Sequence, residues 1–296
     1  MVKKIISHLP PRHLDDWLAI CVLLLKYPKA QVEYIHPQQV PEKYLKDPEI
    51  ILVDVGSVFE PRLRNYDHHQ DLTLPCSLVL ILCYELNFDI EKIGLPFLLA
   101  IDLIDRKGFK YASENLKIPP LKEIDEIRRL ILISEPNELA GMFLLELIDK
   151  QEPLDFNEFI KALYTYLDKR GLLEEAKRKV KEEKKEFERK LKNITVLEFK
   201  TNLGNLKVGM SYKTLAPRHF EVFNTLDLDI LIEKNSMNPQ HTSVIKNTTK
   251  EISKKIDLFK LKEKFPVIFV HPAGFIAVID KPIDEVDIKG VVACLT

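Results

Sequence analysis

The first fifty-five residues alternate short apolar runs with one helical pattern. Residues 3–8, 32–36 and 49–55 are apolar runs that predict three strands, and the last is apolar almost throughout. Such a run is typical of a strand that is covered on both faces of a sheet. Asp15 and Asp16 precede a helical pattern from Trp17 to about Lys26, and acidic residues suit the first turn of a helix. This order of elements predicts a doubly wound, mostly parallel α/β sheet.

Helical periodicity dominates the middle of the chain. Helices are expected at about 76–87, 91–106, 121–133, 138–150 and 156–169. Residues 172–192 carry a thin apolar stripe among Lys, Arg and Glu, which is typical of a long solvated helix. We interpret this helix as a connector between two domains. A nucleic-acid-contacting face is the alternative for it.

The pattern changes again after residue 193. Strands are expected at 194–200, 206–210, 228–233, 241–246, 267–270 and 275–279, and helices at 215–224 and 252–264. This alternation predicts a second, smaller α/β domain. The expected organisation is therefore a first domain over 1–170, a helical connector over 171–192 and a second domain over 193–296.

Composition and charge narrow the classes of function. Lys and Arg number 44 against 45 Asp and Glu, so the net charge of −1 excludes bulk electrostatics as the basis of nucleic-acid or membrane binding. The four cysteines form no CxxC pair, which fits a reducing compartment. The longest apolar run has nine residues, whereas a membrane span needs about 20. The chain also starts without the apolar stretch of a signal peptide, so we expect a soluble, cytoplasmic protein without a membrane partner.

Histidines and acidic residues gather near the ends of the predicted strands. One cluster holds His8, His13 and Asp15, and another is the run 67–69, Asp-His-His. Asp54 lies between them, close to the carboxyl end of an apolar strand. Ligands of open α/β sheets bind at the carboxyl ends of the strands. These positions are therefore the candidates for a functional site.

Two further acids, Asp102 and Asp105, interrupt the apolar segment 95–104. A buried acid costs several kcal/mol unless it is paired or binds a metal ion. Imidazole and carboxylate ligands together suit Mn²⁺, Fe²⁺ or Zn²⁺, and two divalent ions about 3.5–4 Å apart are typical of enzymes that hydrolyse phosphoesters. Taken singly, each residue also has a structural explanation, such as a surface histidine, a helix or turn cap, or an ion pair with Arg106. Their occurrence together favours a two-metal site.

The same residues carry a family resemblance. Residues 65–70, Asn-Tyr-Asp-His-His-Gln, resemble the signature of the DHH phosphoesterases, a superfamily that includes RecJ-type exonucleases, oligoribonucleases and family II pyrophosphatases. Most members begin with a His followed four and six residues later by Asp, but Arg12 stands four residues after His8. The spacing of His8, His13 and Asp15 is similar instead to that of the melanocyte-proliferating-gene branch. Segments 53–56, 60–61, 101–105 and 269–276 resemble further motifs of that branch.

This resemblance implies a role for each candidate residue. It implies two divalent ions, Mn²⁺ as first choice with Mg²⁺ and Co²⁺ as alternatives, held by His8, His13, Asp15, Asp54, His68 and Asp102, with Asp105 as the alternative to Asp102. Asp54 would bridge the ions. As catalytic residues, Asp67 would orient His68, and His69 would face the scissile phosphate. Substrate phosphate would be bound by Arg12, Arg62, Arg106 and a turn containing His271 and Gly274, whose backbone N–H groups can bind anions.

The resemblance implies a metal-dependent phosphodiesterase in which the first domain is catalytic and the second binds substrate. Metal-bound hydroxide would attack the 3′ end of short or single-stranded RNA, with DNA less preferred. The near-neutral net charge favours short oligonucleotides, because each phosphate contact needs a cation. Two alternatives stay open: a hydrolase of a small phosphoanhydride or cyclic dinucleotide, and a non-catalytic nucleic-acid-binding protein. A homodimer is also left open.

Overall fold

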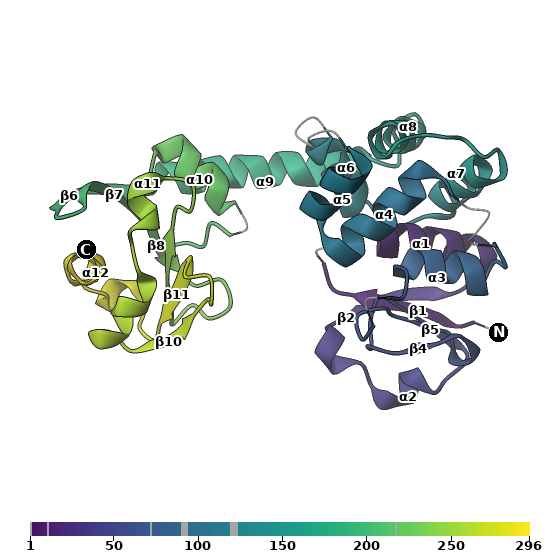
Figure 1. Ribbon diagram of the computed structural model, residues 1–296, viewed down its shortest axis with the longest axis horizontal. Coiled ribbons are helices and arrows are strands. Elements are labelled where there is room, and N and C mark those ends of the chain that lie inside the picture. The colour runs from purple at the N-terminus through teal and green to yellow at the C-terminus, as the bar shows by residue number, and fades with distance from the viewer. Residues whose placement is uncertain (1, 11, 72, 90–93, 119–123, 217) are drawn as a thin grey trace. The chain divides into compact units, whose positions relative to one another are not determined.

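The chain forms two compact units, Met1–Val180 and Lys181–Thr296, in the computed structural model. The structure describes residues 2–10, 12–71, 73–89, 94–118, 124–216 and 218–296. The boundary between the units falls within helix α9 (Glu174–Lys192; Figure 1). The residues of this helix are mostly charged and exposed. No helix of the described ranges is long and apolar enough to cross a membrane.

The first unit is built on a five-stranded sheet with the order β2-β1-β3-β5-β4. Its strands are β1 (Lys4–His8), β2 (Gln31–Ile35), β3 (Ile50–Val53), β4 (Phe59–Glu60) and β5 (Asn65–Tyr66). All neighbours pair in parallel except β4 and β5, which are antiparallel. The predicted α/β class with a mostly parallel sheet is therefore confirmed.

Helices cover both faces of this sheet. Helix α1 (Leu14–Lys26) connects β1 to β2 on one face, and the short α2 (Glu42–Leu45) connects β2 to β3 on the other (Figure 1). Ile5 faces the large core under α1, whereas Ile6 packs with Tyr44 and Leu45 on the α2 side. From β1 the chain moves to β2 on one side, and the next strand, β3, lies on the other side. This reversal makes the carboxyl ends of β1 and β3 a topological switch point, which is where α/β sheets bind ligands.

A group of helices packs on the α1 face and completes the first unit. They are α3 (Ser77–Tyr84), α4 (Pro96–Lys107), α5 (Phe109–Leu116), α6 (Asp125–Ile133), α7 (Glu138–Asp149) and α8 (Phe156–Asp168). Phe97 of α4 stacks on Phe159 of α8 with ring centroids 4.5 Å apart. Gly141 of α7 lies directly against the backbone of α1, since a Cβ atom there would stand 2.5 Å from the Cys21 carbonyl oxygen. These contacts fix the helical layer above the edge of the sheet.

The second unit contains a six-stranded mixed sheet with the order β10-β11-β9-β8-β7-β6. Its strands are β6 (Thr195–Thr201), β7 (Gly204–Ser211), β8 (Ile230–Lys234), β9 (Thr242–Lys246), β10 (Val267–Val270) and β11 (Ile276–Ile279). Only β7 and β8 pair in parallel, and α10 (His219–Leu226) connects them. Val222 and Phe223 of α10 pack on one face, while α11 (Glu251–Lys254) and α12 (Ile288–Leu295) lie with the core of the other.

Several predicted boundaries differ from the structure. The helix predicted at 91–106 begins at Pro96, because proline suits a first helical turn, and residues 90–93 lie outside the described residues. Residues 121–123 of the helix predicted at 121–133 also lie outside them. The helix predicted at 252–264 divides into α11 and a 3₁₀ helix, Leu258–Glu263, which Asp257 caps by accepting a hydrogen bond from the Phe259 N–H. The two-residue strands β4 and β5, and helices α5 and α12, were not predicted.

Candidate metal centre

Three parallel strands end at the candidate site. His8 is the last residue of β1, Asp54 follows β3, and the run Asp67-His68-His69 follows β5. Because β1, β3 and β5 are neighbours in the sheet and run in parallel, their carboxyl ends meet at one edge. The first turn of α1 and helix α4 bring His13, Asp15 and Asp105 to the same edge. The predicted convergence of these residues is therefore found in the structure.

Asp54 has an unusual backbone conformation. Its φ of +56° lies in the left-handed region, and its N–H donates a hydrogen bond to the Tyr66 carbonyl of the neighbouring strand. Such a conformation costs of order 1–3 kcal/mol for a residue other than glycine, although Asp tolerates it better than most. The left-handed backbone turns the Asp54 side chain into the cluster, where it is only 2% exposed.

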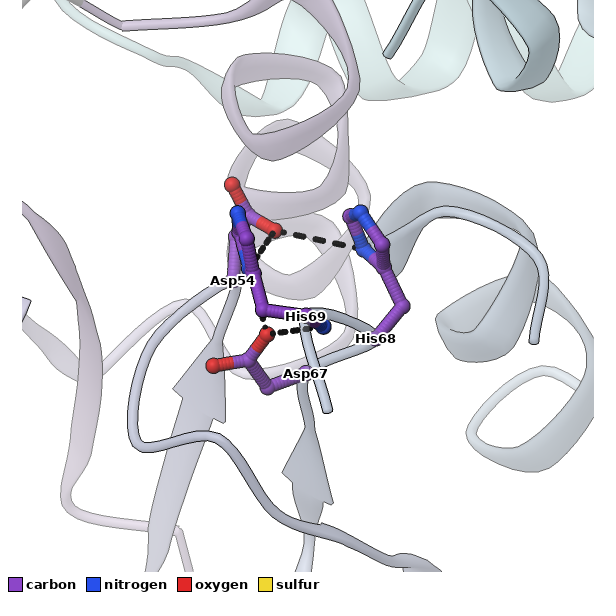
Figure 2. Close-up of side chains that lie close together, drawn as sticks. All are labelled: Asp54, Asp67, His68 and His69. Carbon is purple, nitrogen blue, oxygen red and sulfur yellow. Dashed lines mark hydrogen bonds and ion pairs between the residues drawn. The ribbon is translucent and has the colours of Figure 1, made fainter. Parts of the chain in front are cut away.

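The two Asp54 oxygens face histidines on opposite sides. Oδ1 lies 3.4 Å from His68 Nδ1 and 3.6 Å from His69 Nδ1, and both rings turn towards it (Figure 2). Oδ2 lies 3.6 Å from His8 Nε2 and 3.9 Å from His13 Nδ1. Asp54 also belongs to all three groups of side chains that could each hold a metal ion, with ligand atoms within 4.8 Å of one another. This placement is suited to a bridging carboxylate.

His8 presents a lone pair to carboxylates. Its Nδ1 lies 2.8 Å from the Leu9 carbonyl oxygen, and a carbonyl only accepts, so Nδ1 carries the proton. Nε2 is buried, makes no hydrogen bond, and stands 3.5 Å from Asp16 Oδ2 and 3.6 Å from Asp54 Oδ2. A lone pair that faces carboxylate oxygens requires a cation between them, either a proton or a metal ion. Backbone hydrogen bonding of the other nitrogen is typical of metal-binding histidines.

Asp15 is a buried acid without a partner. Its side chain is 1% exposed, and neither oxygen has a hydrogen-bond partner among the described residues. Burial, followed by the charges of Asp54 and Asp105, raises the pKa of Asp15 well above its usual value. The fold thus places a carboxylate where, without a cation, it is held in the protonated form.

Asp16 is a member of the cluster that the sequence analysis did not assign to the site. It is fully buried, and its Oδ2 accepts a hydrogen bond from the Ser7 hydroxyl at 3.3 Å. Burial raises the pKa of Asp16 to about 6. The only signal in the sequence was its place in the first turn of α1, which is also the ordinary position of a helix-stabilising acid.

Asp105, not Asp102, reaches the histidines. Asp105 lies 3.3 Å from His13 Nδ1 and 3.1 Å from His68 Nε2. Burial raises the pKa of Asp105, but the close approach of these two histidines outweighs this effect, and the net shift of the pKa is downward. Asp102 instead forms an ion pair with Arg106 and accepts a hydrogen bond from the Cys76 N–H at 2.7 Å. The structure therefore brings Asp105, the expected alternative, to the cluster, and places Asp102 in contact with Arg106 and Cys76.

Asp67 orients His69 rather than His68. Its Oδ1 accepts hydrogen bonds from His69 Nδ1 at 2.7 Å and from the His69 backbone N–H at 3.0 Å (Figure 2). Its Oδ2 accepts one from the Ser57 N–H. The carboxylate of Asp67 raises the pKa of His69 to about 9. The side chain of His69 is 53% exposed, whereas that of His68 is 3% exposed. The expected pairing of Asp67 with His68 is thus corrected to His69, and His68 is oriented by Asp105 and Asp54.

The predicted phosphate-binding residues differ in their availability. Arg12 is held by the Ser134 carbonyl and Glu135, lies over the Tyr34 ring, and is only 7% exposed. Arg106 is engaged with Asp102. Arg62 is exposed on the 3₁₀ turn between β4 and β5. The sequence analysis expected Arg12 and Arg106 to bind substrate phosphate, but in the structure both guanidinium groups are already paired within the protein.

His271 and Gly274 form a tight turn between β10 and β11 in the second unit. The Gly274 N–H donates to the His271 carbonyl at 2.7 Å, and Gly274 has a φ of +64°. The Ala273 N–H donates to His271 Nδ1, and the His271 ring lies 4.1 Å from the Phe275 ring. The turn is formed as expected.

The cluster has the donor set of a metal centre. Seven of its buried polar atoms make no hydrogen bond within the described part of the chain: His8 Nε2, both oxygens of Asp15, Asp16 Oδ1, Asp54 Oδ2, His68 Nδ1 and Asp105 Oδ2. Buried polar groups are rarely left without partners in native proteins. Imidazole nitrogens mixed with carboxylate oxygens suit Mn²⁺, Fe²⁺ or Zn²⁺. The residues present therefore fit divalent metal ions.

One comparison with known proteins, a match to a family model, covers the motif at this site. The family model MYG1_exonuc, described as "Uncharacterised protein family (UPF0160)", matches residues 4–73, which confirms the predicted resemblance over that stretch. No curated protein matches the chain. A solved structure, a pGpG-specific phosphodiesterase, PggH, from Vibrio cholerae, is 12% identical over 99% of this chain and 97% of that one, with a TM-score of 0.47. The matched stretch contains His8, His13, Asp15, Asp54 and the run 67–69.

Proposed function

We propose that the protein is a metal-dependent phosphodiesterase whose site is the His/Asp cluster of the first unit. The observation that carries the proposal is Asp54, with His68 and His69 near one oxygen and His8 and His13 near the other. A carboxylate in this position can bridge two divalent ions. Two such ions supply Lewis-acid activation of water and neutralise charge on the phosphate. The family match over residues 4–73 and the donor set support this reading.

The side chains have separable tasks in this proposal. His8, His13, Asp15, Asp54, His68 and Asp105 would hold the ions, and Mn²⁺ is the first choice. Asp16 would support His8 from the side opposite the Leu9 carbonyl. His69 is half exposed, and Asp67 holds its Nδ1 by a hydrogen bond at 2.7 Å, which leaves its Nε2 as the other ring nitrogen. It would hydrogen-bond the substrate phosphate and stabilise the charge that develops on its oxygens.

We propose short or single-stranded RNA, degraded from its 3′ end, as the substrate. A cavity of about 330 Å³ in the second unit supports a ligand with bases, because it is lined by the rings of Phe220 and Phe275 beside Asn247 and Thr248. Phe220 is 65% exposed, so it does not serve as core, and aromatic rings of this kind stack on bases. The turn of His271 and Gly274 adjoins Phe275. The N–H groups of His271, Ala273 and Gly274 already donate hydrogen bonds within the turn and to β11, so the imidazole Nε2–H of His271 would be its donor to a phosphate.

One set of substrates tests the proposal. The full chain is incubated with Mn²⁺ and, separately, with a labelled RNA 5-mer, bis-p-nitrophenyl phosphate, pyrophosphate and a cyclic dinucleotide. We expect mononucleotides from the RNA and nitrophenol from the diester, both abolished by chelation. His68→Ala should lower the rate at least 100-fold, because it removes a buried ligand that touches Asp54 and Asp105. The matched control is His241→Ala, which removes a histidine paired with Asp280 in the second unit and should leave the rate unchanged.

Other outcomes would replace the proposal. Orthophosphate from pyrophosphate alone would make the protein a phosphoanhydride hydrolase, and cleavage of the cyclic dinucleotide alone would make it a cyclic-dinucleotide hydrolase. RNA binding without turnover in any metal would make it a nucleic-acid-binding protein. Thermal unfolding of the two variants shows whether a lost rate reflects a lost fold.

A further inference from the structure

We propose that a basic cleft beside the metal centre binds a second phosphate group of an oligonucleotide, one nucleotide away from the phosphate at the metal ions. This basic cleft is a cavity of about 680 Å³ in the first unit. Its cationic lining comes from Arg12, Arg128, Arg129 and Lys179, and His13 belongs to it as well. The inference rests on the proposed function for the place of the reacting phosphate.

The basic cleft adjoins the metal centre through shared residues. His13 and Arg128 line both the basic cleft and a smaller cavity of about 170 Å³, which also touches Asp15 and Asp105. A ligand that reaches the metal ions through the smaller cavity therefore meets Arg128 next. The volume of the basic cleft lies within the range of about 300–1,000 Å³ that is usual for ligand pockets.

Charge distinguishes the basic cleft from the opposite side of the metal centre. Its lining has four basic residues against two acidic ones, Asp125 and Glu135, an excess of two positive charges. The cavity of about 350 Å³ that touches His8, Asp54, Asp67 and His69 is lined by neither Arg nor Lys. The chain as a whole has a net charge of −1. The positive excess is therefore local, and it marks the side on which a substrate anion would extend.

Arg128 is the residue best placed to bind this phosphate. Its Nε is buried and makes no hydrogen bond within the described ranges, while its Nη2 makes one long contact of 3.4 Å with the exposed Asp125. A pair of this kind at i,i+3 on a helix surface contributes little stability, so a phosphate can replace it. The planar guanidinium can then offer two parallel N–H groups to the phosphate.

Lys179 supplies a second cation from α9. It pairs with Glu175 at 3.0 Å, but both side chains are well exposed, at 43% and 63%, which makes the pair weak. Arg12, in contrast, is committed to Ser134 and Glu135 and shapes the wall. Arg128 and Lys179 are therefore the two residues that would determine specificity for the second phosphate, whereas the metal ions would bind the reacting phosphate.

Binding of two non-hydrolysable ligands tests the inference. Both are RNA dinucleotides with a methylene phosphonate linkage, one with and one without a 5′-phosphate, and binding to the full chain with Mn²⁺ is measured by calorimetry. We expect the 5′-phosphate to tighten binding of the wild-type chain about ten-fold. Arg128→Gln and Lys179→Gln should reduce this ratio to below about three. Arg178→Gln, which removes an exposed cation from the same helix, is the matched control and should keep the ratio.

The outcomes separate this inference from the proposed function. An unchanged ratio in both variants overturns the inference, even if the chain hydrolyses RNA. Equal weakening of both dinucleotides by Arg128→Gln also overturns it, because Arg128 would then serve the phosphate at the metal ions. A ten-fold preference that both variants abolish supports the inference even if no substrate is hydrolysed, in which case the proposed reaction fails and the basic cleft stands. The preference should weaken as salt is raised, since it depends on charge.

Discussion

Replacing Asp15 with Asn should stabilise the metal-free protein. Asn keeps the shape of the side chain and removes the charge that burial and the neighbouring acids disfavour. In the folded state the pKa of Asp15 is raised, whereas in the unfolded chain it returns to about 3.9. Between these two values folding takes up a proton, so the stability of the wild-type protein falls as the pH rises. The Asp15→Asn variant lacks this dependence.

The size of the effect follows from the proton count. One proton taken up on folding changes the free energy of unfolding by about 1.4 kcal/mol per pH unit. The first unit spans 180 residues, Met1–Val180, and a domain of that size shifts its Tm by roughly 2–4 °C per kcal/mol. As the pH rises between the two pKa values, the Tm of the metal-free wild type should fall relative to the Tm of metal-free Asp15→Asn. The difference should grow by roughly 3–6 °C per pH unit.

Metal ions should reverse the order of the two proteins. Ions at 100 times their dissociation constant stabilise the folded state by about 2.7 kcal/mol, which is roughly 5–11 °C for this unit. The wild type should show this rise with Mn²⁺ in scanning calorimetry, and Asp15→Asn should lose most of it because a ligand is gone. Thus the variant melts above the wild type in chelator and below it in Mn²⁺.

An exposed carboxylate provides the control. Asp149 ends α7 and is exposed, so Asp149→Asn should change the Tm little in either condition and should keep the Mn²⁺ response. If Asp15→Asn shows the full Mn²⁺-dependent rise at the wild-type metal concentration, Asp15 is no ligand. If the metal-free variant melts below the wild type at neutral pH, the argument from its buried charge is refuted.

Four further variants probe the site and the core. Asp105→Asn should lose the Mn²⁺-dependent rise in Tm. Asp102→Asn should keep this rise but lower the Tm with and without Mn²⁺, because Asp102 binds Arg106 and the Cys76 N–H. If only Asp102→Asn loses the rise, Asp102 and not Asp105 is the metal ligand. Gly141→Ala should destabilise by about 1–3 kcal/mol in urea titrations despite the better helix propensity of Ala, since its Cβ would meet the α1 backbone. Burial raises the pKa of Glu85, but hydrogen bonds from Tyr27 and Tyr66 outweigh it and lower the pKa below its usual 4.5. This stabilisation is present above pH 4.5 and is lost as the pH falls towards the lowered pKa. The free energy of unfolding should therefore fall less steeply with decreasing pH in Glu85→Gln than in the wild type. Parallel pH dependences of the two proteins would contradict this prediction.

The sequence predicted the layers of the first unit because their signals are local. The run 49–55 is apolar on both faces of its strand, and the structure buries it between α1 and α2. Strands β4 and β5 have two residues each, too few for any period to be visible, yet β5 carries the run 67–69 to its place beside Asp54. Strand β5 forms because it pairs with β3, which is distant in the sequence, and not because of the local β-propensity of its two residues.

The candidate site was predicted to the level of the motif and not of the side-chain contacts. Residues three apart share a helix face, so the sequence alone did not show which of Asp102 and Asp105 reaches the cluster. In the structure, Arg106 pairs with Asp102 one helical turn away, and Asp105 contacts the histidines. Asp67 lies next to both His68 and His69 in the sequence, and only the turn after β5 sets which ring receives its hydrogen bond. Arg128 gave no signal, because its role arises from the packing of α6 beside the first turn of α1.

The costs that the fold accepts are concentrated at the His/Asp cluster. Asp54 adopts a left-handed backbone at about 1–3 kcal/mol, and each buried polar group left without a partner costs about 1–3 kcal/mol more. Costs of this size are large beside a total stability of about 5–15 kcal/mol for a typical domain. In the core beneath, Trp17 donates its indole N–H to the Ser134 carbonyl, and Glu85 is fully paired. Seven of the thirteen buried polar atoms that lack a hydrogen-bond partner among the described residues lie at the switch point of this one sheet. The simplest physical explanation of this concentration is that a cation completes them.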